Sequence, residues 1–174
     1  AANTFTAKGR INDSNLDVAM DIHGKLGGKY PLVSGIIDIN KADLKSLQLS
    51  TDSMILSSRV SIETEDLGPG HIIAGVYLDS NILYIKGKTV LLDSISLTGS
   101  SSPDSSHVSL KTPFLAARLN TNYELSQLPG EFEHLWHRIY PGKTSENNVG
   151  VNHCTSVDAS LTQHEVLTTF LPDF

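Results

Sequence analysis

The stretch GIIDINKADLKSLQL, residues 35–49, changes its pattern of apolar side chains about half-way along. From two residues before this stretch to Ile39, every second residue is apolar or glycine, and these residues would lie on one side of an extended strand. These positions are Val33, Gly35, Ile37 and Ile39. Leu44 and Leu47 are then three residues apart, which is the spacing of neighbouring side chains on a helix. The stretch therefore predicts a β-strand that ends in a single helical turn.

The composition limits the class of protein and the kind of partner. The chain has 174 residues, enough for one domain with a core, and 39% of them are hydrophobic, as in an ordinary folded protein. No segment reaches the ~20 apolar residues of a membrane-spanning helix. The net charge of -6, without a cluster of basic residues, argues against nucleic acid as a partner. The single cysteine, Cys154, cannot form an internal disulfide and leaves the compartment open.

Alternation of apolar and polar residues recurs on both sides of this stretch and predicts further strands. The clearest run is Leu16–Ile22, and a second run begins at Met54. The sequence Gly-Pro-Gly at residues 68–70 is a turn signal, so a third run from Ile72 should form a hairpin with the second. The predicted continuous apolar face consists of Leu16, Val18, Met20, Ile22, Val33, Ile37, Ile39, Met54, Leu56, Val60, Ile62, Ile72, Val76 and Leu78. The residues expected to point to water from the other face include Asp17, Asp21, Arg59 and Glu63.

The second half of the chain alternates more weakly. A turn at residues 79–81 is expected to lead into a strand at 82–86, and shorter strands near Ile95, Val108 and Leu115 give eight or nine in all. The serine-rich residues 100–106 have no periodicity and predict an exposed hairpin loop. We expect one or two short helices, the first at residues 130–140 and the second near residues 166–170.

The predicted helices are too small to cover the predicted sheet. Eight strands ~4.8 Å apart and ~25 Å long give a face of roughly 1,000 Å², whereas a three-turn helix about 10 Å wide covers roughly 150 to 200 Å². The apolar face must therefore close on itself as a sandwich or barrel, pack against neighbouring sequence, or enclose an apolar molecule such as a lipid.

Candidate catalytic and metal sites are weaker than their structural alternatives. Glu131, His134 and His137 have the spacing of metal ligands on a helix, but a solvated helix face opposite the apolar stripe explains them better. His153 and Cys154 are adjacent, so in a strand they would point to opposite faces and could not act as base and nucleophile. The glycine-rich residues 24–29 are followed by Tyr-Pro, without the Ser or Thr and the helix of a phosphate loop. We therefore expect no metal, no cofactor and no enzymatic activity.

The order of the segments resembles a known family. A strand that ends in DINKADLKSLQL is followed by MILSSRVSIE, by a hairpin into IAGVYLDS, by ISLTGSSSP and HVSLKTPFLAARLNTNYEL, and by FEHLWHRIYP. Over residues 16–141, and less closely over residues 148–174, this order resembles the TamB branch of the AsmA-like proteins, in particular the long versions of Bacteroidetes-type bacteria. The shared motifs are spaced apolar residues together with Asp43-Leu44 and Tyr140-Pro141.

The resemblance implies a fold and a function. The fold is mainly β, a long, curved, half-open antiparallel sheet with an apolar concave face and one or two short helices. Residues 1–174 would be a single β-rich segment of a much longer protein, anchored in the inner membrane and crossing the periplasm. Proteins of this family are thought to conduct phospholipid toward the outer membrane, so the predicted apolar face would be a lipid groove. The implied partners are phospholipid acyl chains and, for an assembly role, an outer-membrane barrel protein, while membrane contact would come from parts of the full-length protein outside these residues.

A second interpretation also fits the sequence. The segment could serve as a structural or binding module that assists outer-membrane protein assembly. In that case the apolar faces would meet in a closed β-sandwich, and no lipid path would exist.

Overall fold

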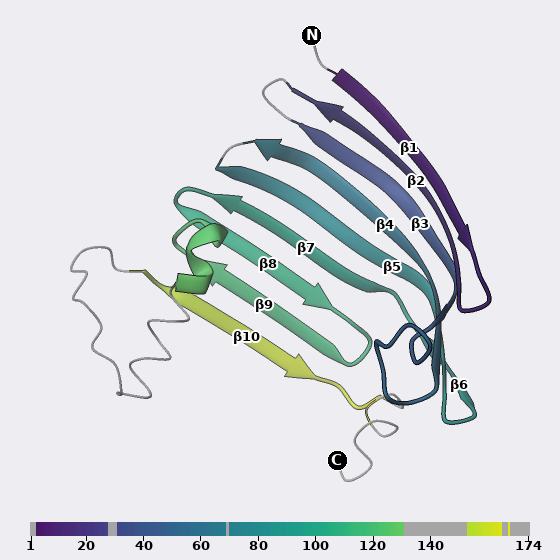
Figure 1. Cartoon of the computed structure of the whole chain (residues 1–174). Coiled ribbons are helices and arrows are strands. Elements are labelled where there is room, and N and C mark those ends of the chain that lie inside the picture. Colours follow the sequence, from purple (N-terminus) through teal and green to yellow (C-terminus); the bar gives the residue numbers. More distant parts are fainter. Residues whose placement is uncertain (1–2, 28–30, 69, 131–152, 165–166, 168–174) are drawn as a thin grey trace.

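The computed structural model describes residues 3–27, 31–68, 70–130, 153–164 and 167. Strands make up 71% of these residues and form one antiparallel sheet of ten strands (Figure 1). The strands are β1 (Asn3–Asn12), β2 (Leu16–Leu26), β3 (Leu32–Asp43), β4 (Met54–Gly68), β5 (His71–Ile85), β6 (Lys88–Leu92), β7 (Ile95–Ser102), β8 (Ser105–Lys111), β9 (Leu115–Thr121) and β10 (Thr155–Leu161). The mainly β fold predicted from the sequence is confirmed.

The sheet is an open meander. Each strand pairs with the next along the chain, except that β7 continues from β5 while β6 pairs with the far end of β5. The edge strands β1 and β10 lie at opposite ends of the sheet and do not pair with each other (Figure 1). The described residues therefore form a single sheet, and the closed β-sandwich of the second interpretation is not the observed architecture.

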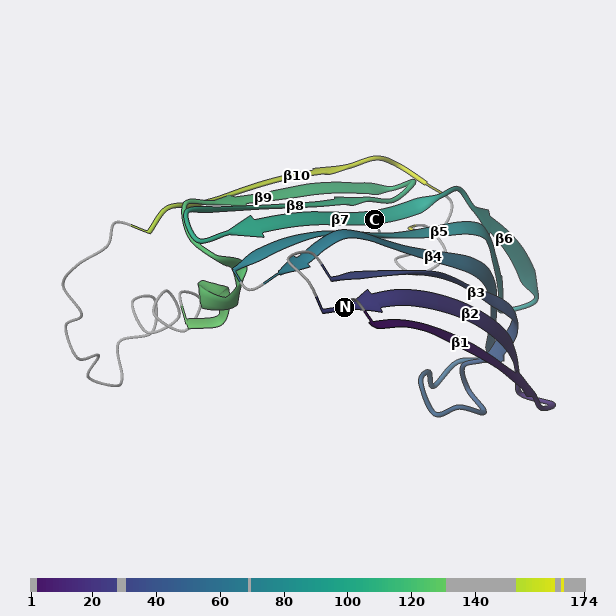
Figure 2. The ribbon, with the colours of Figure 1, turned by 90° about the horizontal axis from the view of Figure 1, so that it is seen from above.

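The sheet curves along its strands, and one face lies inside the curve (Figure 2). The short 3-10 helix η1 (Leu125–Gln127) lies on this inner side, where the backbone N–H of Leu125 donates a hydrogen bond to Ser101 Oγ at 2.9 Å. The face that carries Ser101 is therefore the concave one. Residues 128–130, which follow η1 directly, are also helical.

The end of β3 forms the predicted single turn. The N–H of Leu47 donates to the carbonyl oxygen of Asp43 at 3.0 Å, which closes one helical turn. The Asp43 carboxylate accepts hydrogen bonds from the N–H groups of Lys45 and Ser46, both at 3.1 Å, and from Ser46 Oγ at 2.9 Å. These bonds, chiefly those from Ser46, hold the pKa of Asp43 below its ordinary value. The change of period at Ala42 thus marks the start of an acid-capped turn.

A small buried cluster lies where the sheet folds over at one end. Leu83 and Ile85 of β5 and Val90 of β6 are buried and pack with Met54, Leu56, Leu92 and Phe114. A two-residue turn joins β5 to β6, and its residues Lys86 and Gly87 have φ angles of 50° and 79°. Such positive values suit a tight hairpin turn, and they bring Val90 opposite Leu83.

The hairpin predicted at residues 100–106 is present, but its exposed loop is only Pro103 and Asp104, so the predicted loop was too long. Residues 100–102 belong to β7 and residues 105–106 to β8, and both Ser101 and Ser106 are buried. Ser101 Oγ and Ser106 Oγ are hydrogen-bonded at 2.8 Å, and Ser106 Oγ also donates to the carbonyl oxygen of Tyr123 at 2.7 Å. Because the hydroxyls satisfy one another, these two serine side chains can be buried side by side.

The predicted turn at residues 79–81 was wrong, because β5 continues through it. The strand contains a β-bulge there, with Ser80 at φ 54°, and the register with β4 shifts between Ser57 and Arg59. Ser58 Oγ donates to the side-chain oxygen of Asn81 at 2.6 Å, so the bulge buries a satisfied polar pair. A bulge and a turn use the same residue types, which explains the error.

The count of eight or nine strands was too low. Strands β1, β6 and β10 were not predicted, since their apolar residues alternate only briefly or are mixed with glycine and alanine. The hairpin predicted from Met54 and Ile72 is confirmed as β4 and β5. Of the helix predicted at residues 130–140 only Gly130 is described, and it is helical, while most of the second predicted helix near residues 166–170 lies outside the described residues.

Candidate functional site

The register of the sheet assigns every strand residue to one of two faces. Cross-strand partners share a face, and neighbours along a strand point to opposite faces. One row of partners on the concave face crosses the sheet from β1 to β10 and contains only apolar residues and glycine. It runs through Ala7, Ile22, Gly35, Ile62, Val76, Leu97, Leu110, Ala117 and Ala159.

All the residues of the predicted apolar face lie on this concave side. The adjacent row joins Met20, Ile37, Val60 and Leu78 in register, and Ile72 pairs with the concave-facing Ser101. The remaining members follow from alternation along β2, β3, β4 and β5, and they are Leu16, Val18, Val33, Ile39, Met54 and Leu56. The structure therefore brings the whole predicted set together.

Within the described residues, the concave face is apolar and no second layer covers it. None of the predicted residues is fully buried, and Met20 and Ile72 are 40% and 41% exposed. Toward the β10 edge, Leu97, Val157 and Leu161 are 45%, 62% and 65% exposed. A continuous exposed apolar surface of this kind indicates a binding surface.

The face extends beyond the residues that sequence reasoning identified. Val108 on β8, Leu119 on β9 and Val157 on β10 are register partners and continue the apolar surface to the far edge. The signal was present in the sequence as alternate apolar residues in β8 and β9, but no face could be assigned to them without the strand pairing.

The concave face contains an apolar depression of about 210 Å³ near η1. Its lining includes Ile72, Val76, Leu97, Val108 and Leu125. Gly99 lies between Ala74 and Val108 in register, and the missing side chain deepens the surface there. The depression is the point where an apolar ligand would make contact with two sides, the sheet and η1.

Gly35 has a different role, because it allows β2 and β3 to approach closely. A Cβ atom on Gly35 would lie 2.7 Å from the carbonyl oxygen of Asp21 and 2.8 Å from the Cα of Ile22. These are backbone atoms, which cannot move without disturbing the pairing. For Gly99 the nearest such atom is 3.6 Å away, so a methyl group would fit there.

The convex face is polar and neutralises many of its charges across the strands. Lys8 Nζ lies 2.7 Å from Asp21 Oδ2, and Arg59 Nε lies 2.6 Å from Asp38 Oδ1. The hydrogen bond from Lys8 lowers the pKa of Asp21, and Asp38 raises the pKa of Arg59. The expected outward residues Asp17, Asp21, Arg59 and Glu63 all lie on this face. The two faces of the sheet thus differ sharply in chemistry.

The other candidate sites from the sequence do not assemble in the described residues. Across those residues, no three His, Cys, Asp or Glu side chains gather closely enough to hold a metal ion. Glu131, His134 and His137 lie outside the described residues. His153 and Cys154 precede β10; the His153 ring packs on Tyr123 with ring centroids 4.6 Å apart, and Cys154 is exposed. The glycine-rich stretch at residues 24–29 begins as the end of β2, with Gly27 at φ 81°.

Comparisons with known proteins supply no relative. No protein-family model, no curated protein and no solved structure matches the chain. No helix within the described ranges has the length and apolar character needed to cross a membrane.

Proposed function

We propose that the concave face binds the acyl chains of phospholipids, and that the chain is a segment of a periplasmic bridge protein that conducts phospholipid between the inner and outer membranes. The observation that supports the proposal is the uncovered apolar row from Ala7 on β1 to Ala159 on β10. Exposing such a surface to water is unfavourable, and an acyl chain would remove much of it from water at ~0.8 kcal/mol per buried CH₂ group.

The dimensions of the face suit an acyl chain. The sheet path from β1 to β10 without β6 has eight strand spacings of ~4.8 Å, so the apolar row is about 38 Å long. One leaflet of a bilayer core, and therefore one acyl chain, is ~15 Å thick. The row is more than twice that length, so a chain could shift along it without leaving apolar surface.

The curvature of the sheet and the polarity of its convex face also suit a lipid conduit. The concave shape surrounds a chain on more than one side, while the open side lets a charged headgroup remain in water (Figure 2). The ion-paired convex face, with Lys8–Asp21 and Arg59–Asp38, keeps the outer surface hydrated. The resemblance to the TamB branch of the AsmA-like proteins gives this proposal its location in the periplasm, with membrane contact made by other parts of a longer protein.

A structural role remains the alternative. A module that assists outer-membrane protein assembly could cover the same face with a partner, such as an outer-membrane barrel protein. The exposed edge strand β10, in which every residue is exposed, favours this alternative because its free backbone groups can pair with another strand.

Photo-crosslinking in cells distinguishes the two functions. A photoreactive residue replaces Val60 or Ile37 on the concave face. The matched controls place it at Ser61 or Glu63, which lie on the convex face of β4 and are each adjacent to a concave residue. The lipid proposal predicts phospholipid adducts at Val60 and Ile37 only. Protein adducts at the concave positions without lipid would favour the structural module.

A further inference from the structure

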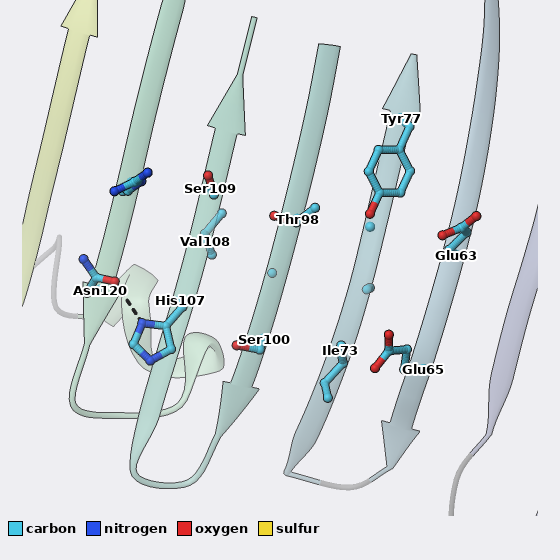
Figure 3. A pocket seen from close by; sticks show the side chains of 14 residues that line it. Glu63, Glu65, Ile73, Tyr77, Thr98, Ser100, His107, Val108, Ser109 and Asn120 are labelled. Carbon is cyan, nitrogen blue, oxygen red and sulfur yellow. Dashed lines mark hydrogen bonds between the residues drawn. The ribbon is translucent and has the colours of Figure 1, made fainter. Parts of the chain in front are cut away.

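A second depression, of about 390 Å³, lies on the convex face over β5 and β7 (Figure 3). Its floor consists of residues with short side chains, among them Gly75, Thr98 and Ser100. Gly75 is buried, and the hydroxyl of Tyr77 lies over it, since a Cβ atom at Gly75 would be 2.8 Å from that oxygen. Longer side chains from β4, β5, β8 and β9 surround this floor and make the depression.

The two walls of the depression have opposite charge. Glu63 and Glu65 of β4 form one wall, and Figure 3 shows the Glu65 carboxylate beside Ile73 on β5. The opposite wall is formed by His107 of β8 with Arg118 and Asn120 of β9. His107 Nδ1 and Asn120 Oδ1 are 2.8 Å apart, so these two side chains hold each other in place (Figure 3).

The charges of the walls are not neutralised within the described part of the chain. There, Glu63, Glu65 and Arg118 make no ion pair, and although Asp158 is the register partner of Arg118, the two do not come within 4.0 Å. Elsewhere on the same face, ion pairs join Lys8 with Asp21, Arg10 with Asp17, and Arg59 with Asp38. Charges without an internal partner are thus grouped on both sides of the depression.

The distance between the walls sets the size of a ligand. Glu63, Gly75, Thr98, Ser109 and Arg118 are successive register partners. Four strand spacings separate the outer two Cα atoms by about 19 Å, and the long side chains of Glu63 and Arg118 can shorten the distance between their charged groups by leaning over the depression. An extended chain of three amino acids spans about 10 Å.

We propose that this depression binds a short zwitterionic ligand of peptide type. The amino group of the ligand lies at Glu63 and Glu65, and its carboxylate lies at Arg118. The hydroxyls of Thr98 and Ser109 hydrogen-bond the peptide groups of the ligand between its two ends. A nucleotide or other polyanion would be repelled by the acidic wall, and a neutral saccharide would leave both charges without a partner. The site is on the opposite face from the apolar row and does not depend on the proposed lipid function.

Amide chemical shifts of the full 174-residue chain, titrated with trialanine, test the proposal. Because the site is open, we expect a dissociation constant on the order of 1 mM, with shifts confined to β4, β5, β7, β8 and β9 around the depression. N-acetyl-trialanine amide, which lacks both charges, and the neutral sugar maltotriose should bind much more weakly.

Charge-removing variants with matched controls complete the test. Glu63→Gln and Arg118→Gln should each weaken trialanine binding by up to about fivefold, the range for a solvent-exposed ion pair, and the double variant should weaken it further. The controls are Asp79→Asn and Lys111→Gln, which remove the same charges from the convex face outside the depression and should leave binding unchanged. The proposal is overturned if trialanine produces no shifts at these residues, if the capped peptide or maltotriose binds equally well, or if the controls weaken binding as much as the wall variants.

Discussion

The Val60→Glu substitution separates lipid binding from folding, because Val60 is central to the concave face but only partly buried. It lies between its register partners Ile37 and Leu78. Full burial of a valine side chain contributes about 1.5 to 3 kcal/mol, so roughly half of that, about 1 kcal/mol, is lost here. Weaker cross-strand contacts with the two partners add about 0.2 to 1 kcal/mol each. The expected loss of stability is therefore about 1.4 to 3 kcal/mol, against the ~5 to 15 kcal/mol of a typical domain.

The effect on lipid binding should be larger. A charged side chain in contact with hydrocarbon costs about 2.5 to 3.5 kcal/mol, which corresponds to a loss of affinity of roughly 70- to 400-fold. The open side of the sheet lets the new carboxylate lean toward water, so we expect a loss of at least about tenfold. The affinity is measured by displacement of a fluorescent fatty acid, and the stability by urea unfolding followed by circular dichroism.

Ser61→Glu is the matched control, because it adds the same charge one residue away on the convex face. It should leave fatty-acid affinity unchanged. The reasoning is refuted if Val60→Glu binds fatty acid as the unmodified protein does, or if Ser61→Glu weakens binding equally. A loss of more than about 4 kcal/mol of stability in Val60→Glu would instead show that a packed layer covers the residue.

Two further predictions concern β3 and the turn that follows it. Gly35→Ala should destabilise the protein by about 1 to 3 kcal/mol in urea unfolding, because the added methyl group meets the backbone of β2. Gly99→Ala should be neutral or stabilising by up to about 1 kcal/mol. Equal effects of the two substitutions would contradict the close approach of β2 and β3 at Gly35. The Asp43 carboxyl should titrate by NMR below its ordinary pKa of 3.8, so that its stabilisation of the turn is present above that pH and is lost as the pH falls through the lowered value. Ser46→Ala should move the midpoint back toward 3.8, and an unchanged midpoint would show that the hydrogen bonds do not hold the turn in solution.

The sequence by itself determined which side chains share a face within one strand. Alternation is a local consequence of the pleated backbone, so Leu16 to Ile22 and Met54 to Ile62 could be assigned without a structure. The turn after β3 was predictable for the same reason, since helical spacing and the Asp43 cap are encoded within a few residues.

The tertiary structure alone decided how the strands join into one surface. The bulge at Ser80 and the burial of Ser101 against Ser106 depend on hydrogen bonds to residues on neighbouring strands, which local periodicity does not report. The same is true of the curvature, the open edges, and the convex depression, which Glu63 and Arg118 line from strands far apart in the chain. Register and curvature arise from pairing between distant segments, and they place one apolar face inside the curve and one polar face outside it.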